Sequence, residues 1–271
     1  MKYLIIGAGG TGGVTGYYMK KSRQGCNSDR PRRTPENNPG TGPYLRKNVG
    51  QNRRNDHHPG CRHGTLHRPS RRNFCLRKKA IPWMKPFHLS NRLQRKTTIV
   101  IPVLNIYGTG GKMQKQLPEL LVTDGCIYVS ANIKEPGRLL QHGQILRIVF
   151  GVRDKAESRP ELKEIQKDLC DSNIDGILSE NIRREALEKF SYVSPIGAAG
   201  LYYHATAADF QKEGEARELF KAMIREIAAL AEAMGVPFQK DMVDVNLKNS
   251  LQPCTGSNYL YAEGHHGRKT V

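Results

Sequence analysis

The sequence predicts an α/β protein in which a parallel-sheet domain with a disrupted centre precedes an all-helical domain. Three observations support this fold class. Residues 3–6 form a short apolar run that is followed by a glycine-rich turn and a helix-forming segment. Apolar, β-branched runs typical of buried strands return after residue 98, and the second half of the chain has apolar residues at helical spacing. The long segment between the first helix and residue 98 has neither period.

The glycine-rich turn carries the most specific motif in the chain. Gly7, Gly9 and Gly12 have the G-x-G-x-x-G spacing, and strand, turn and helix together form the first half of a Rossmann-type βαβ unit. The first glycine is expected to make a tight turn, the second to let a pyrophosphate approach the backbone, and the third to let the helix pack against the strand. The alternative is a flexible turn in another α/β protein. The predicted cofactor-binding residues are Gly7, Ala8, Gly9, Gly10, Thr11 and Gly12.

The next segment with the pattern of a buried strand is TTIVIPVLN, which ends at Asn105 before the turn IYGTGGK. Ligands of open α/β sheets bind at the carboxyl ends of the strands, so Asn105 is predicted to touch the cofactor or substrate. An asparagine that only caps a turn is the equally good alternative. Two further strands, CIYVSANI and QILRIVFGV, are expected to be joined by a hairpin connection over KEPGRLLQHG.

The second half of the chain is predicted to be helical. ELKEIQKDLC and ENIRREALEKFSYV have apolar residues at helical spacing, and the strongest helix covers residues 215–236. Its buried stripe is expected to contain Leu219, Met223, Ile227 and Leu230, with Gly235 ending it. The predicted domains are residues 1–155, dinucleotide-binding; 156–248, helical; and 249–271, an irregular, truncated tail. The first includes a disordered or mispatterned segment over residues 22–97.

The charge of the chain is concentrated in one segment. The net charge is +18, and residues 22–97 contain 19 Lys and Arg against 3 Asp and Glu, so this segment carries nearly all of it. Non-specific binding to polyanions is therefore expected. No apolar run reaches the length of a membrane-spanning helix, and six cysteines without a pairing pattern favour a cytoplasmic protein.

Three hypotheses compete for residues 22–97. The segment is a basic insert that binds nucleic acid, a metal site, or an out-of-frame translation of an ordinary gene. The first lacks aromatic residues interleaved with the basic ones. The second fits no common ligand spacing, so no metal is expected. The candidate ligands under the metal-site hypothesis are His57, His58, Cys61, His63 and His67.

The genetic code allows the third hypothesis to be explored. With suitable synonymous codons, reading one base later turns SRQGCNSDRPRRTPENNP into AGKDVTVIARGAHLKTIQ, which has a strand and then a helix. The same shift turns SRRNFCLRK into PDVIFVCVK, a buried strand. The shifts fall beside Lys21, Lys78 and Lys96, and lysine codons are adenine-rich. The hypothesis therefore supplies two strands at points where the fold needs them.

The motifs IIGAGGTGG, PVLNIYGTGGKM and ENIRREALEKF together resemble the ketopantoate reductase (2-dehydropantoate 2-reductase) family, over about residues 1–21 and 98–248. The resemblance implies NADP(H) as cofactor and reduction of 2-dehydropantoate, a 2-oxo acid, to pantoate in pantothenate biosynthesis. It implies Asn105 as a residue near nicotinamide and substrate, and Lys189 as the catalytic residue. A homodimer is compatible with it.

The chain also departs from that family. Val193 stands four residues after the lysine, where many members have a substrate-binding asparagine. The family's C-terminal glutamate and its basic residue for the 2′-phosphate would fall in the two segments read as out of frame, residues 22–97 and 249–271. We therefore expect impaired or absent activity. The alternatives are another NAD(P)-dependent oxidoreductase with the same two domains, and a basic polyanion-binding protein acting through residues 22–97.

Overall fold

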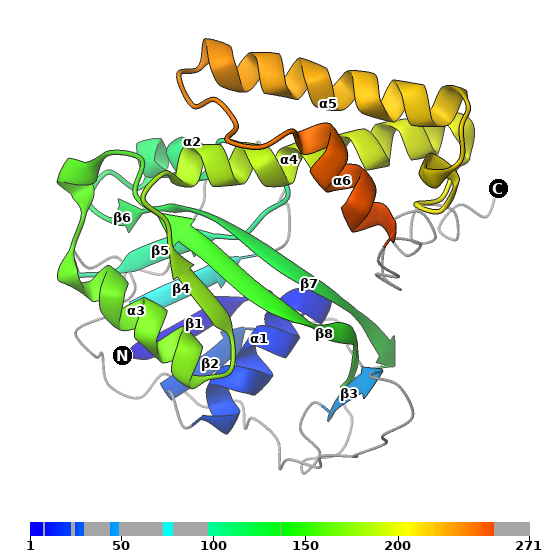
Figure 1. Cartoon of the computed structure of the whole chain (residues 1–271). Helices are drawn as coiled ribbons and strands as arrows, with labels where there is room; N and C mark the ends of the chain where they lie inside the picture. Colours follow the sequence, from blue (N-terminus) through cyan, green and yellow to red (C-terminus); the bar gives the residue numbers. More distant parts are fainter. Residues whose placement is uncertain are drawn as a thin grey trace, which may run out of the picture. The chain divides into compact units, whose positions relative to one another are not determined.

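The computed structural model describes residues 1–7, 9–22, 25–29, 44–48, 73–77, 97–135 and 137–251 (Figure 1). The chain forms two compact units, Met1–Ile182 and Arg183–Val271. The first unit is built on β-sheets and the second on helices, which is the predicted fold class.

The first unit contains a sheet of parallel strands in the order β2-β1-β4-β5-β6. Strand β1 (Lys2–Ile6), which lies between β2 and β4, buries Tyr3 and Ile5, the alternate residues on one face of the apolar run. The helix α1 (Gly10–Lys21) follows β1 and buries Val14 and Met19 in the same core. The other strands are β2 (Gly25–Asp29), β4 (Asn73–Arg77), β5 (Ile99–Pro102) and β6 (Leu121–Val122).

Strands β2 and β4 differ from the expectation that residues 22–97, as written, form no strand. Both pair with β1 in parallel, with Ile6 opposite Asp29 on one side and Arg77 on the other. They occupy the positions at which the shifted reading has DVTVI and IFVCV, whereas the chain has GCNSD and NFCLR there. Backbone hydrogen bonds to a neighbouring strand do not depend on side-chain pattern, and a pattern-based prediction cannot detect them.

A second sheet in the same unit contains β3 (Tyr44–Asn48), β7 (Asp124–Glu135), β8 (Arg138–Gly151) and β9 (Asp175–Leu178). Strands β7 and β8 pair antiparallel, and Glu135 lies opposite Arg138. The hairpin turn is therefore much tighter than the ten-residue connection expected from the sequence. Leu139 to His142, placed in that connection, belong to the ladder and pair with β7 across an irregularity between Val129 and Ser130.

The unit boundary lies later than the predicted one after residue 155. Helix α3 (Pro160–Asp171) buries Leu162, Ile165 and Leu169 in the core that contains Tyr3 and Ile5. Strand β9 pairs with β8, so it too belongs to the first unit. The apolar stripe of an amphipathic helix predicts that the helix is half-buried, but it does not tell against which domain it packs. The short 3₁₀ helix η1 (Lys155–Glu157) precedes α3.

The second unit contains the helices α4 (Ile182–Tyr203), which begins at the boundary, α5 (Glu215–Ala233) and α6 (Met242–Leu251), with the 3₁₀ turn η2 (Asp209–Gln211). One core joins them, with Ile196 of α4, Phe220 and Ile224 of α5, and Met242 of α6. Gly235 has a φ of +69°, in agreement with its predicted role at the end of α5.

The buried stripe of α5 is shifted from the predicted one. The buried residues are Phe220, Ile224, Ile227 and Ala231. Leu219 and Met223 pack only partly buried at the edge of the core, and Leu230 is 47% exposed. A helix with apolar residues over a wide arc leaves the direction of its core face undetermined by the sequence.

Candidate active site

The glycine turn has the geometry that its motif predicts. Gly7 has a φ of +98°, which favours glycine and makes the tight turn after β1. A Cβ at Gly12 would lie 2.1 Å from the carbonyl oxygen of Gly7, so only glycine allows α1 to approach β1 so closely. A Cβ at Gly9 would meet no atom of the described residues within 4 Å, so these residues leave the space in front of its backbone open. Ala8, also predicted as a cofactor-binding residue, lies outside the described residues.

Two other predicted residues of this turn have packing roles. A Cβ at Gly10 would lie 2.4 Å from the carbonyl oxygen of Ala131, because strand β7 passes over the start of α1. Thr11 is 1% exposed, and its carbonyl accepts a hydrogen bond from the hydroxyl of Thr15. Thr11 is therefore part of the core of this unit. The sequence motif could not separate these roles, because β7 lies more than a hundred residues away in the chain.

The start of α1 is a suitable place for an anion. Its N-cap is Gly9, no side chain caps it, and no acidic residue occurs in its first turn. The first N–H groups of a helix lack partners within the helix and carry the positive end of its dipole. Together with the open space at Gly9, this fits the phosphates of a dinucleotide.

Asn105 emerges from the same edge of the sheet as the glycine turn. Ile6 of β1 is paired with Arg77 of β4, and Arg77 is paired with Pro102 of β5, so the carboxyl ends of these parallel strands are aligned. Asn105 is exposed and lies in the turn between β5 and α2 (Thr109–Gln116). One strand separates the two features, as required for residues that contact one extended ligand.

The sequence alone did not identify the end of β2 as a site position. This strand ends at Asp29, on the same edge and next to β1. In dinucleotide-binding sheets the residue at this position recognises the adenosine ribose. The prediction missed Asp29 because GCNSD lacks the apolar pattern by which a strand, and thus its end, is recognised.

Lys189 belongs to the second unit. It lies on α4 and is only 9% exposed, which is unusual for a lysine and differs from a solvated helix lysine. Ser191, two residues further along α4, makes two hydrogen bonds. The Ser191 hydroxyl donates to the carbonyl of Glu188 at 2.7 Å and accepts from the amide nitrogen of Asn246 at 3.0 Å. Asn246 and Ser191 are buried, and their bond joins α6 to α4.

The residue before Lys189 is electrostatically perturbed. Burial raises the pKa of the Glu188 carboxyl above its ordinary value of 4.5, and the neighbouring Glu185 raises it further. Arg184 and Lys240 act in the opposite direction. A cation therefore lies within electrostatic reach of Glu188 from the loop before α6, and the carboxyl is held in a less polar setting than water.

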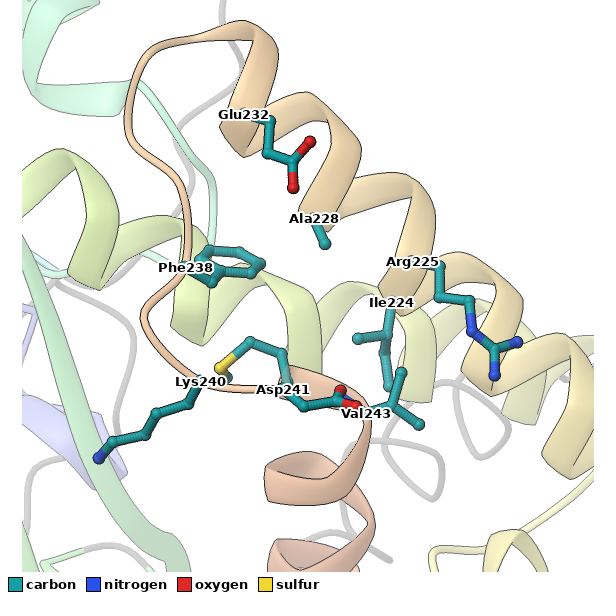
Figure 2. A pocket seen from close by; sticks show the side chains of 9 residues that line it. Ile224, Arg225, Ala228, Glu232, Phe238, Lys240, Asp241 and Val243 are labelled. Atoms are coloured by element: carbon teal, nitrogen blue, oxygen red, sulfur yellow. The ribbon is translucent and has the colours of Figure 1, made fainter.

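A pocket of about 150 Å³ lies between α5 and the segment that leads into α6 (Figure 2). Ile224, Ala228 and Phe238 form an apolar part of its wall, and the Lys240 side chain extends away from them. Sites for cofactors usually measure about 300–1,000 Å³. This pocket is too small for a dinucleotide, and Asp241 beside it already accepts a hydrogen bond from the backbone of Val243 at 2.8 Å.

The described part of the chain has neither a cluster of metal ligands nor a membrane-spanning helix. No three His, Cys, Asp or Glu are grouped there as metal ligands, and the His57–His67 cluster lies outside it. Among the same residues, no helix combines the length and apolarity needed to cross a membrane.

The fold is shared with solved reductase structures. A 2-dehydropantoate 2-reductase from Geobacter metallireducens GS-15 is 17% identical, with a TM-score of 0.73, over 95% of this chain and 84% of that chain. D-mandelate dehydrogenase with NADH and anilino(oxo)acetate is 16% identical, with a TM-score of 0.70, over 96% and 83%. A dimeric ketopantoate reductase from Staphylococcus aureus is 16% identical, with a TM-score of 0.65, over 98% and 94%.

The helical unit is the part of the chain that matches a family model. Residues 181–270 match the family model of the ketopantoate reductase PanE/ApbA C terminal. This segment is therefore similar to the C-terminal part of ketopantoate reductases. A comparison with curated protein sequences gives no match. Lys189 lies within the matched segment, whereas the sheet unit shares only its fold with the solved structures.

Proposed function

We propose that the chain has the framework of an NADPH-dependent reductase that transfers a hydride to a 2-oxo acid, with 2-dehydropantoate as the first candidate. The observation that carries this proposal is the edge of the first sheet. There an uncapped helix start, the open backbone at Gly9 and the turn with Asn105 follow aligned strands. A dinucleotide along this edge would place its phosphates at α1 and its nicotinamide towards Asn105.

Lys189 is proposed as the catalytic residue. NADPH, when bound, would supply the hydride to the ketone carbon of the substrate. Negative charge then develops on the ketone oxygen, and a lysine ammonium can stabilise this charge and donate the proton. The low exposure of Lys189 supports the role, because a charge shielded from water acts more strongly on a neighbouring charge. The amide of Asn105 is proposed to hold the nicotinamide or the substrate.

The preference for NADP(H) rests on family resemblance. D-mandelate dehydrogenase, a structural neighbour, was solved with NADH, so the shared fold is compatible with either cofactor. Asp29 ends β2, and an acidic residue at this position is typical of NAD-dependent enzymes. Titration of the purified chain with NADPH and NADH, followed by cofactor fluorescence, separates the two.

We propose further that the chain as written has impaired turnover. Val193 replaces the family's asparagine four residues after Lys189, and a carboxylate for the reaction would have to come from the tail after Leu251. The experiment measures NADPH oxidation with 2-dehydropantoate by this chain and by a chain with the shifted reading restored in both segments. We expect turnover only by the restored chain.

Each outcome of this experiment has a distinct meaning. Turnover by the chain as written would refute the impairment. No turnover by either chain, with nucleotide still bound, would point to another 2-oxo acid, to be found by a substrate screen on the restored chain. Coding DNA whose codons across Lys21, Lys78, Lys96 and Lys248 forbid the shifted readings would refute the frame hypothesis itself.

A homodimer and a cytoplasmic location complete the proposal. The dimer is supported by the relative from Staphylococcus aureus, which is described as dimeric. Light scattering after size-exclusion chromatography tests it, and a molar mass near 30.4 kDa, that of one chain, would contradict it.

A further inference from the structure

The turn that carries Asn105 is anchored by a side chain from another strand. Helix α2 starts after Gly108, which has a φ of +73°, and no side chain of the turn itself caps the helix. Instead, the backbone N–H of Gly110 donates to Oδ1 of Asp124 at 2.8 Å. Asp124 is the first residue of β7, and its side chain is 14% exposed. A partly buried carboxylate thus occupies the positive end of α2.

A second residue holds Asp124 in place. Arg153 lies with Nη1 at 3.5 Å from Oδ2 of Asp124, and its Nη2 donates to the carbonyl of Val122 at 2.8 Å. The packing is close. A Cβ on Gly110 would lie 2.2 Å from Oδ1 of Asp124 and 2.2 Å from the carbonyl oxygen of Thr123. A side chain at position 110 would therefore displace the carboxylate, and glycine allows the close contact.

The turn transmits this constraint to Asn105. The hydroxyl of Thr109 donates to the carbonyl of Ile106 at 2.8 Å, which closes the turn directly after Asn105. At the other end of α2, the Gln114 amide donates to the carbonyl of Leu120 at 2.8 Å and accepts from the N–H of Val122 at 2.9 Å. Helix α2 is thus held at its start by Asp124 and near its end by Gln114.

We propose that Asp124 is a positioning residue that fixes the Asn105 amide for the reduction, an inference that rests on the proposed function. Asp124 does not itself touch the reacting atoms. Asp124 also accepts a hydrogen bond from the backbone at the start of α2, whereas no described side chain caps the start of α1. An anionic ligand is therefore expected to bind at the start of α1 and not at that of α2. This arrangement directs cofactor phosphates to the glycine turn and leaves the Asn105 turn for the uncharged amide of nicotinamide or for the substrate.

The test compares three variants of the full chain. D124A removes the anchor. D124N keeps an oxygen that accepts from Gly110 and removes the charge. D175A is the control, because it breaks the exposed ion pair between Asp175 and Arg147, in which the Arg147 Nε to Asp175 Oδ2 distance is 2.5 Å, in the same unit. Hydrogen exchange is followed for peptides covering residues 103–112, with residues 160–171 of α3 as an internal reference.

We expect D124A to speed exchange over residues 103–112 by about tenfold or more, since a hydrogen bond to a charged group is lost, and to leave the reference unchanged. D124N should restore most of the protection, and D175A should have no effect on this peptide. Unchanged exchange in D124A would overturn the inference. Faster exchange in both peptides would reduce Asp124 to a general stabilising residue and would overturn it too.

Kinetics supply a second readout wherever the chain turns over a 2-oxo acid. D124A should lower kcat by about tenfold or more with KM for the nucleotide nearly unchanged, and the loss should not add to that of N105A. Additive losses would contradict action through Asn105. If the chain with the shifted reading restored has no turnover, the proposed function is in question, while the exchange result still decides whether Asp124 holds the turn.

Discussion

Gly9 and Gly12 have different surroundings, although both are glycines of the same G-x-G-x-x-G motif. Gly12 packs against the Gly7 carbonyl, whereas no described residue lies within 4 Å of a Cβ built at Gly9. The first is required by the packing of this unit, and the second is required only if a ligand approaches. The two roles can therefore be separated by one substitution each.

We predict that G12A lowers the free energy of unfolding by about 1–3 kcal/mol, because an added Cβ must push the helix away from the strand. G9A should leave stability unchanged and weaken nucleotide binding. Thermal unfolding and a nucleotide titration measure the two effects. Loss of stability in G9A, or an unchanged G12A, would contradict the roles assigned to them.

A pH dependence is predicted at Glu188. A carboxyl whose pKa is raised by burial destabilises the fold when it is ionised, so its cost is present above the raised pKa and disappears as the pH falls below the unfolded value of 4.5. E188Q should therefore stabilise the helical unit at pH 7 and lose this advantage near pH 4. Urea unfolding at both pH values tests this, and a stabilisation independent of pH would refute it.

At the scale of elements, helix α5 shows how far an amphipathic pattern defines a core face. Ile224 is fully buried and Leu230 is 47% exposed, although both are apolar and six positions apart. We predict that I224A costs about 2–5 kcal/mol of unfolding free energy, and L230A well under 1 kcal/mol. Chemical denaturation of the two variants checks this. Equal losses would mean that Leu230 is covered in solution, as it would be in a dimer.

Strands β2 and β4 are the elements that depend most on tertiary pairing. Their residues as written, GCNSD and NFCLR, do not form strands by propensity. Both lie beside β1, whose apolar residues are buried in a core made with α1 and α3. An established strand exposes backbone donors and acceptors on both edges, and these can order a neighbouring segment of almost any composition.

At the scale of the whole molecule, charge and structure are unevenly distributed. Nearly all of the net charge of +18 comes from residues 22–97, while the rest of the chain has the balance of an ordinary enzyme. This segment also contains β2, β3 and β4. The same stretch therefore contributes both to the proposed cofactor-binding sheet and to the expected attraction for polyanions.

We predict that the chain binds duplex DNA weakly, without sequence preference, and with an affinity that falls linearly on a log–log plot against salt. Changing six arginines of the basic segment to glutamine should make the fall of affinity with salt concentration less steep. The six are Arg32, Arg33, Arg53, Arg54, Arg71 and Arg72. The control changes six exposed cations outside it: Lys2, Lys155, Lys163, Lys167, Lys212 and Arg225. Fluorescence anisotropy measures both. A greater effect of the control would locate the binding elsewhere.

Much of the fold could be predicted from the sequence. The glycine turn, the strand before Asn105 and helices α3 and α5 were predicted close to their observed positions, because their signals are local. Helix α4 was predicted only to Val193, whereas it continues through Pro195 to Tyr203. Gly7 and Gly12 were assigned their structural roles from spacing alone. The resemblance to ketopantoate reductases, too, rests on motifs that are short and contiguous, and residues 181–270 match that family's C-terminal model.

Tertiary structure decided what depends on distant neighbours. It placed α3 and β9 in the first unit, turned the α5 stripe towards Phe220 and Ile224, and assigned Gly10 and Thr11 to packing. It also brought Asp124 to the start of α2, fourteen residues beyond Gly110. The physical reason is common to these cases. A periodic pattern states that one face of an element is buried, whereas its partner is determined only when separate parts of the chain pack together.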